Sequence, residues 1–240
     1  MDTFFGTLLL ALLATLALHS EPLRIVCFGD STTATRPGVF TYCEALQKEF
    51  GGDRAEIVNR GVPANTTADA KARFEHDVMD EKPGLVFLMF GLNDSAIDVW
   101  KNPPADRPRV SLGDFRANLR YFLDALQATG ARAVLMTFNP TRWTPKLKDL
   151  YAKPPYLPEV AEGLDVGRSE YIAAIRQVAA EKHVELLDVN SGFKAYAEAP
   201  GHALNDLLLD GIHPNSLGQS ITAALARRVV EAALTARGNR

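Results

Sequence analysis

The sequence of 240 residues has few cysteines, no excess of positive charge and no apolar stretch long enough for a typical membrane span. Two cysteines cannot form the disulfide framework of a small secreted scaffold. The formal net charge of -3 provides no basic footprint for nucleic acid or an anionic membrane surface. We therefore expect no nucleic-acid partner, and a small neutral or weakly charged substrate.

The two cysteines both lie in apolar surroundings. Cys27 falls within an apolar run, and Cys43 lies on the apolar side of the helix expected next, beside Val39, Phe40 and Leu46. Buried free thiols are favoured, because cysteine is among the residues most often buried. A disulfide between the two remains open as the second interpretation.

The first 20 residues differ from the rest of the chain. Residues 4–18 are nearly all apolar, and polar residues return at 19–22. This stretch is shorter than the roughly 20 residues of a membrane-spanning helix, so we predict a signal peptide at 1–20 and a mature domain at 21–240. We expect an exported protein, periplasmic or secreted, without stable membrane association after signal removal. The segment lacks a basic start and has a poor cleavage site, so a membrane anchor is the second interpretation.

The remainder has the composition of one globular domain, with 47% hydrophobic and 23% charged residues overall. Five short apolar runs alternate with helix-like stretches, which predicts a parallel sheet covered on both faces. The runs span Leu23 to Phe28, Glu56 to Val58, Leu85 to Phe90, Ala131 to Phe138 and Val184 to Val189. The helical stretches span Phe40 to Phe50, Ala68 to Asp80, Leu112 to Thr129, Ser169 to Lys182 and Ser216 to Ala236. The expected fold class is α/β, a three-layer α/β/α sandwich with a five-stranded parallel sheet.

Polar residues and glycines follow the first three apolar runs, where the carboxyl ends of parallel strands meet and ligands bind. Ser31 follows the first run, Gly61 the second and Asn93 the third. Taken singly, Ser31 suits a helix cap, and Gly61 and Asn93 suit turns. Taken together, the backbone amides of Ser31 and Gly61 and the side chain of Asn93 could stabilise an oxyanion.

A base and its orienting acid are found near the C-terminus. Asp210 and His213 stand three residues apart in a Leu-Asp-Gly-Ile-His-Pro segment ahead of the last expected helix. On a turn, this spacing lets the carboxylate accept from one ring nitrogen while the other faces Ser31. Singly, His213 also suits a structural role and Asp210 an ordinary turn.

Four blocks in this order resemble those of the SGNH, or GDSL-type, hydrolases: Gly29-Asp30-Ser31, Gly61, Gly91-Leu92-Asn93-Asp94 and Asp210-Gly211-Ile212-His213. The resemblance covers residues 29–213 and implies a flavodoxin-like fold and ester hydrolysis without metal or other cofactor. It implies Ser31 as nucleophile, His213 as base and Asp210 as orienter. Ser31, Gly61 and Asn93 would form the oxyanion hole. The first block continues with threonine instead of leucine, which loosens any inference about the substrate.

Two proline-rich loops, Asp98 to Val110 and Asn139 to Arg168, are expected to form the rim of the site. Trp100 and Trp143 in these loops could stack on sugar rings, or could bury area to hold irregular loops. We predict hydrolysis of short acyl esters, above all acetyl esters of carbohydrates, with the oligomeric state left open. Lysophospholipid or thioester hydrolysis is the nearer alternative.

Two interpretations come from other functional classes. The first is a metal-dependent hydrolase with Asp206, Asp210, His213 and His202 as ligands, since carboxylates and imidazoles cluster in this segment. It leaves Ser31 and Asn93 without roles. The second is a binding module on the same fold that has lost turnover, which the presence of all three triad residues weakens.

Overall fold

The computed structural model describes residues 21–238, so the expected signal peptide at 1–20 lies outside the described residues. Its centre is a single sheet of five parallel strands in the order β2-β1-β3-β4-β5. The strands are β1 (Leu23–Gly29), β2 (Ala55–Gly61), β3 (Leu85–Met89), β4 (Arg132–Met136) and β5 (Glu185–Leu187). The predicted α/β class and five-stranded parallel sheet are confirmed.

Helices connect successive strands. They are α1 (Tyr42–Phe50), α2 (Thr67–Phe74) with a π-helical turn (Glu75–Met79), α3 (Leu112–Ala128), α4 (Pro145–Tyr151), α5 (Arg168–Glu181), α6 (Val189–Glu198), a 3-10 turn (Leu204–Leu207) and α7 (Ser216–Gly238). The sequence pattern predicted five of these helices and missed α4 and α6. No helix among residues 21–238 is long and apolar enough to cross a membrane.

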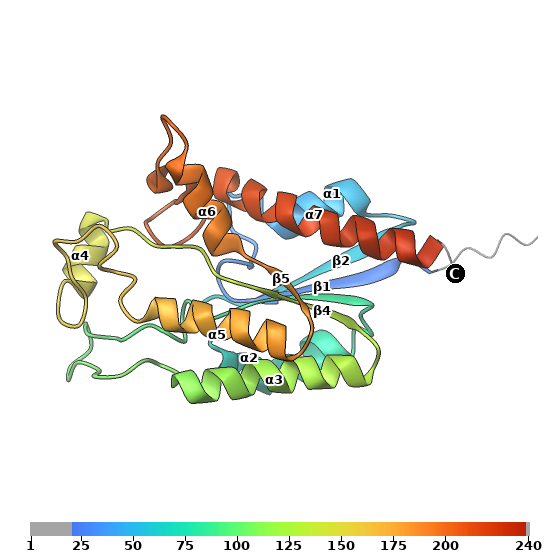
Figure 1. Cartoon of the computed structure of the whole chain (residues 1–240), viewed down its shortest axis with the longest axis horizontal. Helices are drawn as coiled ribbons and strands as arrows, with labels where there is room; N and C mark the ends of the chain where they lie inside the picture. Colours follow the sequence, from blue (N-terminus) through green and yellow to red (C-terminus); the bar gives the residue numbers. More distant parts are fainter. Residues whose placement is uncertain (1–20, 239–240) are drawn as a thin grey trace, which may run out of the picture.

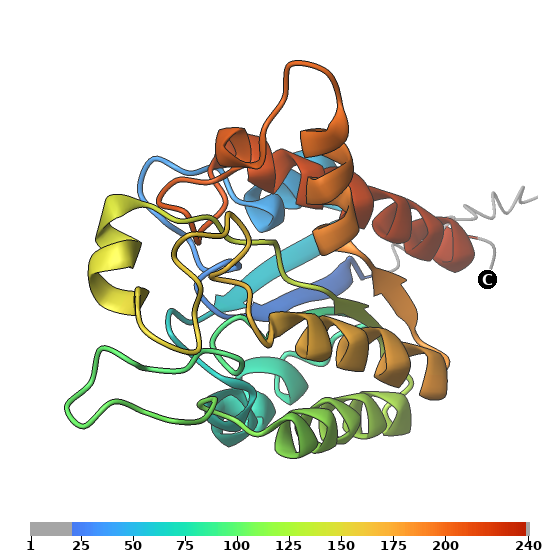
Figure 2. The same ribbon diagram turned by 60° about the vertical axis from the view of Figure 1, so that its left-hand side comes forward.

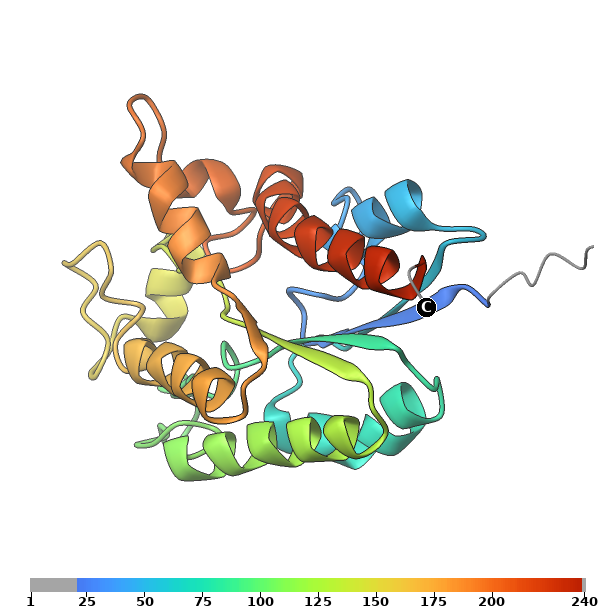
Figure 3. The same cartoon turned by 45° about the vertical axis from the view of Figure 1, so that its right-hand side comes forward.

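The helices cover the sheet in two layers, with α2, α3 and α5 on one face and α1, α6 and α7 on the other (Figures 1 and 3). Neighbouring residues of β1 serve both layers, because side chains alternate across a strand. Val26 and Phe28 pack in the first core, and Ile25 and Cys27 in the second. Apolar residues on both faces of the central strands produce the continuous apolar runs of the sequence.

Capping residues define where two helices begin. Thr41 accepts from the Glu44 amide and Glu44 accepts from the Thr41 amide, so α1 starts one residue later, at Tyr42. Thr66 and Asp69 form the same capping box ahead of α2. This second cap fixes the short segment that leads from β2 to α2.

The strand order has its switch point at β1 and β3, since the chain proceeds from β1 to β2 on one side and from β3 to β4 on the other. Ser31 follows β1 and Asn93 follows β3, so both lie at the crevice expected at such a point. Figure 2 brings this end of the sheet, with α4 and the long loops around it, toward the viewer.

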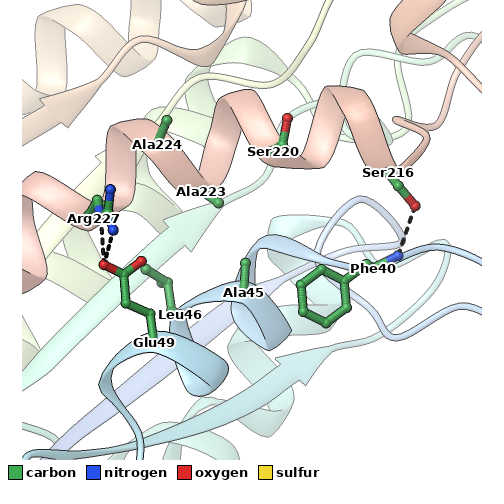
Figure 4. Close-up of a pocket in the computed structure, with 9 residues that line it drawn as sticks. All are labelled: Phe40, Ala45, Leu46, Glu49, Ser216, Ser220, Ala223, Ala224 and Arg227. Atoms are coloured by element: carbon green, nitrogen blue, oxygen red, sulfur yellow. Dashed lines mark hydrogen bonds and ion pairs between the residues drawn. The ribbon is translucent and has the colours of Figure 1, made fainter.

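Helices α1 and α7 pack side by side on the second face, with a pocket of about 280 Å³ between them (Figure 4). Ser216 Oγ accepts from the Phe40 amide at one end, and Arg227 pairs with Glu49 at the other. None of the predicted site residues lines this pocket.

The two cysteines belong to the same layer. Both are buried and unbonded, as the sequence favoured. Burial raises the pKa of the Cys43 thiol well above its ordinary value, so this thiol stays protonated and inert near neutral pH.

Candidate active site

Ser31, His213 and Asp210 form a continuous hydrogen-bonded chain. His213 Nε2 lies 3.0 Å from Ser31 Oγ, and His213 Nδ1 lies 2.8 Å from Asp210 Oδ2. The structure therefore brings together three residues that the sequence placed at opposite ends of the domain. The arrangement fits a hydroxyl, a base that can take its proton and a carboxylate that orients the base.

The environment of Asp210 favours its charged form. Burial opposes ionisation, but the hydrogen bonds from the His213 ring and the backbone amides of His213 and Ile212 outweigh it and hold the pKa of Asp210 below its ordinary value. Both amides donate to Oδ1, at 3.1 Å from Ile212 and 2.9 Å from His213. This leaves Oδ2 for the imidazole.

The turn that carries Asp210 and His213 requires a glycine between them. Gly211 has φ of +87°, and a Cβ there would lie 2.4 Å from the Arg142 carbonyl oxygen. The Gly211 carbonyl accepts from the Arg142 amide at 2.8 Å, and Asn139 Nδ2 donates to the Ile212 carbonyl at 2.8 Å. The segment after β4 thus holds the turn from behind, a role for Asn139 and Arg142 that the sequence analysis missed.

The loop that carries Ser31 is organised by Asp30. Its Oδ1 accepts from the Thr32 amide and hydroxyl, each at 2.8 Å, and its carbonyl accepts from the Thr33 and Ala34 amides. The Ser31 amide, in contrast, donates to no other group among the described residues. It is available to bind an oxygen of a ligand.

Gly61 has a structural role that differs from the predicted one. Its amide donates to Asn59 Oδ1 at 2.9 Å, and Gly61 does not line the cleft at Ser31. A Cβ at Gly61 would lie 2.3 Å from the Ala34 nitrogen. The glycine therefore lets the loop after Ser31 pack against β2, and its engaged amide is a poor candidate for an oxyanion donor.

Ala64, three residues later, lies where the second backbone donor was expected. It lines the cleft with Ser31 and His213, and its amide donates to no other group among the described residues. Its φ of +64° lies in the left-handed region, which alanine rarely adopts. An alanine gives no sequence signal for such a conformation, so the analysis above chose the nearby glycine.

Asn93 lies between the loops that follow β1, β2 and β3. Its Nδ2 donates to the Asn65 carbonyl at 3.1 Å and to Asp30 Oδ2 at 3.3 Å, and its Oδ1 accepts from Arg109 Nη1 at 3.2 Å. The amide group of Asn93 borders the same cleft as Ser31. The structure thus places this predicted residue beside the nucleophile candidate.

The cleft has a volume of about 310 Å³ and is open to solvent. Besides Ser31, Asn93 and His213, it is lined by Pro63, Ala64, Leu92, Ile212, Arg36 and Arg109. Arg36 Nη1 lies 4.0 Å from Asp210 Oδ2. The walls are short apolar side chains next to two guanidinium groups, which suits a small acyl group attached to a polar alcohol.

Neither predicted substrate-binding tryptophan lines this cleft. Trp100 is 45% exposed, with the Lys101 ammonium 5.6 Å from its ring centroid. Trp143 Nε1 donates to the carbonyls of Leu157 and Val160, at 3.3 and 3.0 Å. These contacts favour the alternative role, in which the indole of Trp143 holds an irregular loop.

Asp94 is a buried carboxyl next to the site that the sequence analysis left without a role. Its Oδ1 accepts from the Thr67 amide at 2.8 Å and from the Thr67 hydroxyl, whereas its Oδ2 has no hydrogen-bond partner. Burial raises the pKa of Asp94 to about 6, and the charge of Asp30 adds to the effect. Asp94 ties the start of α2 to the loop after β3.

The four residues of the metal-site alternative do not converge. Asp206 accepts from the Ala203 amide, and the His202 ring packs against Tyr196. Within residues 21–238, no group of three or more His, Cys, Asp or Glu side chains could hold a metal ion. That alternative has no ligand set in the described part of the chain.

Residues 27–221 match the profile of the GDSL-like lipase/acylhydrolase family. The uncharacterized lipoprotein YqeF of Bacillus subtilis is 32% identical over 219 residues, which cover 86% of each chain. An acetylxylan esterase of Geobacillus stearothermophilus is 29% identical over 198 residues, or 82% of this chain and 80% of that one.

Solved structures match at the level of the fold. The crystal structure of Axe2, an acetylxylan esterase from Geobacillus stearothermophilus, has a TM-score of 0.67 at 23% identity and covers 88% of this chain and 95% of its own. LAE5, an enzyme from the metagenome of Lake Arreo, has a TM-score of 0.67 at 24% identity, with 89% and 97% covered. The chain belongs to the GDSL-like lipase/acylhydrolase family and is a carboxylic ester hydrolase.

Proposed function

We propose that this protein is a serine esterase that removes acetyl groups from carbohydrates through a Ser31-His213-Asp210 triad. The observation that carries the proposal is the 3.0 Å contact between His213 Nε2 and Ser31 Oγ, with the other ring nitrogen held by Asp210. This geometry lets one imidazole accept the hydroxyl proton and later return it.

The reaction proceeds in two steps. His213 takes the Ser31 proton while Oγ attacks the ester carbonyl, and the protonated imidazole then gives that proton to the leaving alcohol. Water, deprotonated by His213, attacks the acyl-enzyme and releases acetate and free Ser31. Asp210 stays ionised throughout and stabilises the imidazolium formed in each step.

The oxyanion hole consists of the Ser31 amide, the Ala64 amide and the Asn93 side chain. Ala64 replaces Gly61 in this assignment, because the Gly61 amide is already bonded to Asn59 and the Ala64 amide is not bonded within the described residues. Donors aimed at a developing negative charge stabilise the transition state more than the substrate. Asn93 must exchange its bond to Asp30 or Asn65 for the oxyanion.

The choice of acetyl esters rests on the small cleft and on the acetylxylan esterase among the relatives. Leu92 and Ile212 leave room for a short acyl group beside Ser31, while the open mouth of the cleft accommodates a larger alcohol. We also propose that the protein is exported, in line with its N-terminal sequence and with the relative that is a lipoprotein.

The test is a substrate series on the purified protein. Specificity constants are measured for acetyl, butyryl and octanoyl esters of one alcohol, for acetylated xylo-oligosaccharides and for an acyl thioester, with Ser31→Ala as control. Acetyl should exceed butyryl by about tenfold or more, since one methylene is worth roughly 1 to 3 kcal/mol in a tight pocket. A preference for octanoyl or for the thioester would overturn the carbohydrate assignment. A fluorophosphonate should label Ser31 alone, and labelling elsewhere would overturn the triad.

A further inference from the structure

The carboxamide of Asn93 is surrounded by groups that can each play only one part in a hydrogen bond. Arg109 can only donate, and it contacts Oδ1. The Asn65 carbonyl can only accept, as can the Asp30 carboxylate, and both contact Nδ2. The two sets of neighbours therefore fix which end of the carboxamide is oxygen and which is nitrogen.

The single neighbour that fixes the oxygen end is itself held firmly. Arg109 Nε lies 3.1 Å from both carboxylate oxygens of Asp98, and Nη2 lies 2.7 Å from Oδ1. One edge of the planar guanidinium is thus used by Asp98, and Nη1 on the other side is left for Asn93. The Arg109 amide also donates to the Ala96 carbonyl at 3.0 Å, so the backbone is tethered as well.

Asp98 is a suitable anchor because it is buried and charged. Its residue is 3% exposed, and Lys101 Nζ lies 2.8 Å from Oδ2. Burial opposes ionisation, but the bonds from Arg109 and Lys101 outweigh it and hold the pKa of Asp98 below its ordinary value. The proline-rich loop from Asp98 to Val110 therefore contributes a fixed guanidinium to the cleft, a different contribution from the tryptophan expected from its sequence.

We propose that Arg109, anchored by Asp98, is a positioning residue that orients the Asn93 carboxamide as an oxyanion donor. This inference rests on the proposed function. Without the Nη1 donor, the carboxamide can rotate and present Oδ1 to the oxyanion, where like partial charges repel. The donor is then lost in the transition state, while the substrate binds as before.

The experiment is a double-mutant cycle on the complete protein with an acetyl ester. Arg109→Lys and Arg109→Ala are each made in the wild-type and the Asn93→Ala background, and kcat, KM and the thermal midpoint are measured. Lysine can keep the ion pair with Asp98, but its single ammonium cannot span both Asp98 and Asn93 in this fork geometry. Arg107→Ala, an exposed arginine on the same loop, is the matched control.

We expect both Arg109 variants to lower kcat by about 10- to 100-fold with KM within about twofold, as for the loss of a charge-assisted hydrogen bond felt in the transition state. In the Asn93→Ala background the further loss should be under about threefold, because the residue through which Arg109 acts is gone. Arg109→Lys should keep the thermal midpoint, which separates positioning from folding. Arg107→Ala should leave kcat unchanged.

Two results would overturn the proposal. The first is an equal loss of kcat in both backgrounds, which would mean that Arg109 acts independently of Asn93. The second is a rise in KM alone, which would make Arg109 a substrate-binding residue. Failure of the proposed function itself is distinct, since it would appear as no ester hydrolysis by the wild type or as full activity in Ser31→Ala.

Discussion

His213 Nε2 lies 3.0 Å from Ser31 Oγ, although 182 residues separate the two in the chain. The contact depends on two turns at the same edge of the sheet, one after β1 and one before α7. Each turn is fixed by its own aspartate, Asp30 for the serine and Asp210 for the histidine. The relationship makes the geometry of the pair sensitive to side chains that never contact a substrate.

Asp210→Asn should leave the fold intact and lower kcat by up to about 10⁴-fold, the loss seen when such an aspartate no longer selects the productive imidazole tautomer. The amide can still accept from the His213 amide, so the turn should persist. The measurement is kcat with an acetyl ester, together with the far-UV spectrum as a control. Activity within a few-fold of wild type would show that His213 is oriented by another group.

Asn93→Ala should lower kcat by 10²- to 10³-fold, roughly 3 to 4 kcal/mol, with little change in KM, because an oxyanion donor acts mainly on the transition state. Steady-state kinetics with the best acetyl ester provide the measurement. If only KM rose, Asn93 would bind the substrate and would not belong to the oxyanion hole.

Gly61→Ala and Ala64→Gly should have opposite outcomes. A methyl at Gly61 would lie 2.3 Å from the Ala34 nitrogen, so overpacking should cost about 1 to 3 kcal/mol of unfolding free energy and disturb the loop after Ser31. At Ala64 a glycine relieves the left-handed strain and costs chain entropy, two effects of about 1 kcal/mol that nearly cancel. Ala64→Gly should therefore keep both stability and activity. Urea unfolding and kcat decide, and a loss confined to Ala64→Gly would reverse the two assignments.

Asp94→Asn should flatten the pH dependence of stability between about pH 4 and pH 6. The pKa of Asp94 is raised from 3.8 to about 6 in the folded protein, so folding holds the proton more tightly. The stability contributed by the protonated form is complete below the ordinary pKa and is lost as the pH rises through about 6. The loss is on the order of 3 kcal/mol.

An asparagine at 94 does not ionise, so its unfolding free energy should escape this loss. Urea unfolding at pH 4 and pH 7 for both proteins measures the difference between their profiles. Parallel profiles would mean that Asp94 does not titrate in this range. Asp114→Asn, at an exposed carboxylate in the first turn of α3, serves as the control.

Trp143→Phe should lower stability by about 1 kcal/mol through the loss of the indole donor to the Val160 carbonyl, with specificity constants for acetyl esters unchanged. Thermal unfolding and kinetics on a small acetyl ester and on an acetylated xylo-oligosaccharide provide the comparison. A higher KM for the oligosaccharide alone would restore the stacking role that its sequence position suggested.

The sequence was sufficient for the sheet because apolar runs buried on both faces carry a strong signal. It also located Ser31, Asn93, Asp210 and His213 correctly at the sheet edge, since chemistry in parallel sheets follows the ends of strands. The helix α4 was missed because it is a single short segment, Pro145–Tyr151, inside a proline-rich stretch. Short helices depend on tertiary contacts and have little periodicity of their own.

The errors within the site have a different cause. Gly61 was preferred because glycine usually marks a backbone that approaches a ligand, whereas here it marks the approach of the Ala34 backbone. Ala64 adopts its left-handed conformation because the surrounding loop imposes it, and Arg109 reaches Asn93 only because Asp98 anchors it from 11 residues away. Such relations are set by packing between distant segments and leave no local pattern.

Gln219 in the first turn of α7 accepts from the Tyr42 amide and donates to the Thr32 carbonyl, so the last helix is fastened to the segment that carries Ser31. During synthesis Ser31 emerges from the ribosome long before His213 and the helix that follows it. The nascent chain therefore has a serine without a base, and it cannot attack esters until α7 docks. Ester hydrolysis consequently reports the completion of folding, and a protease that removes α7 silences the enzyme while leaving most of the sheet in place.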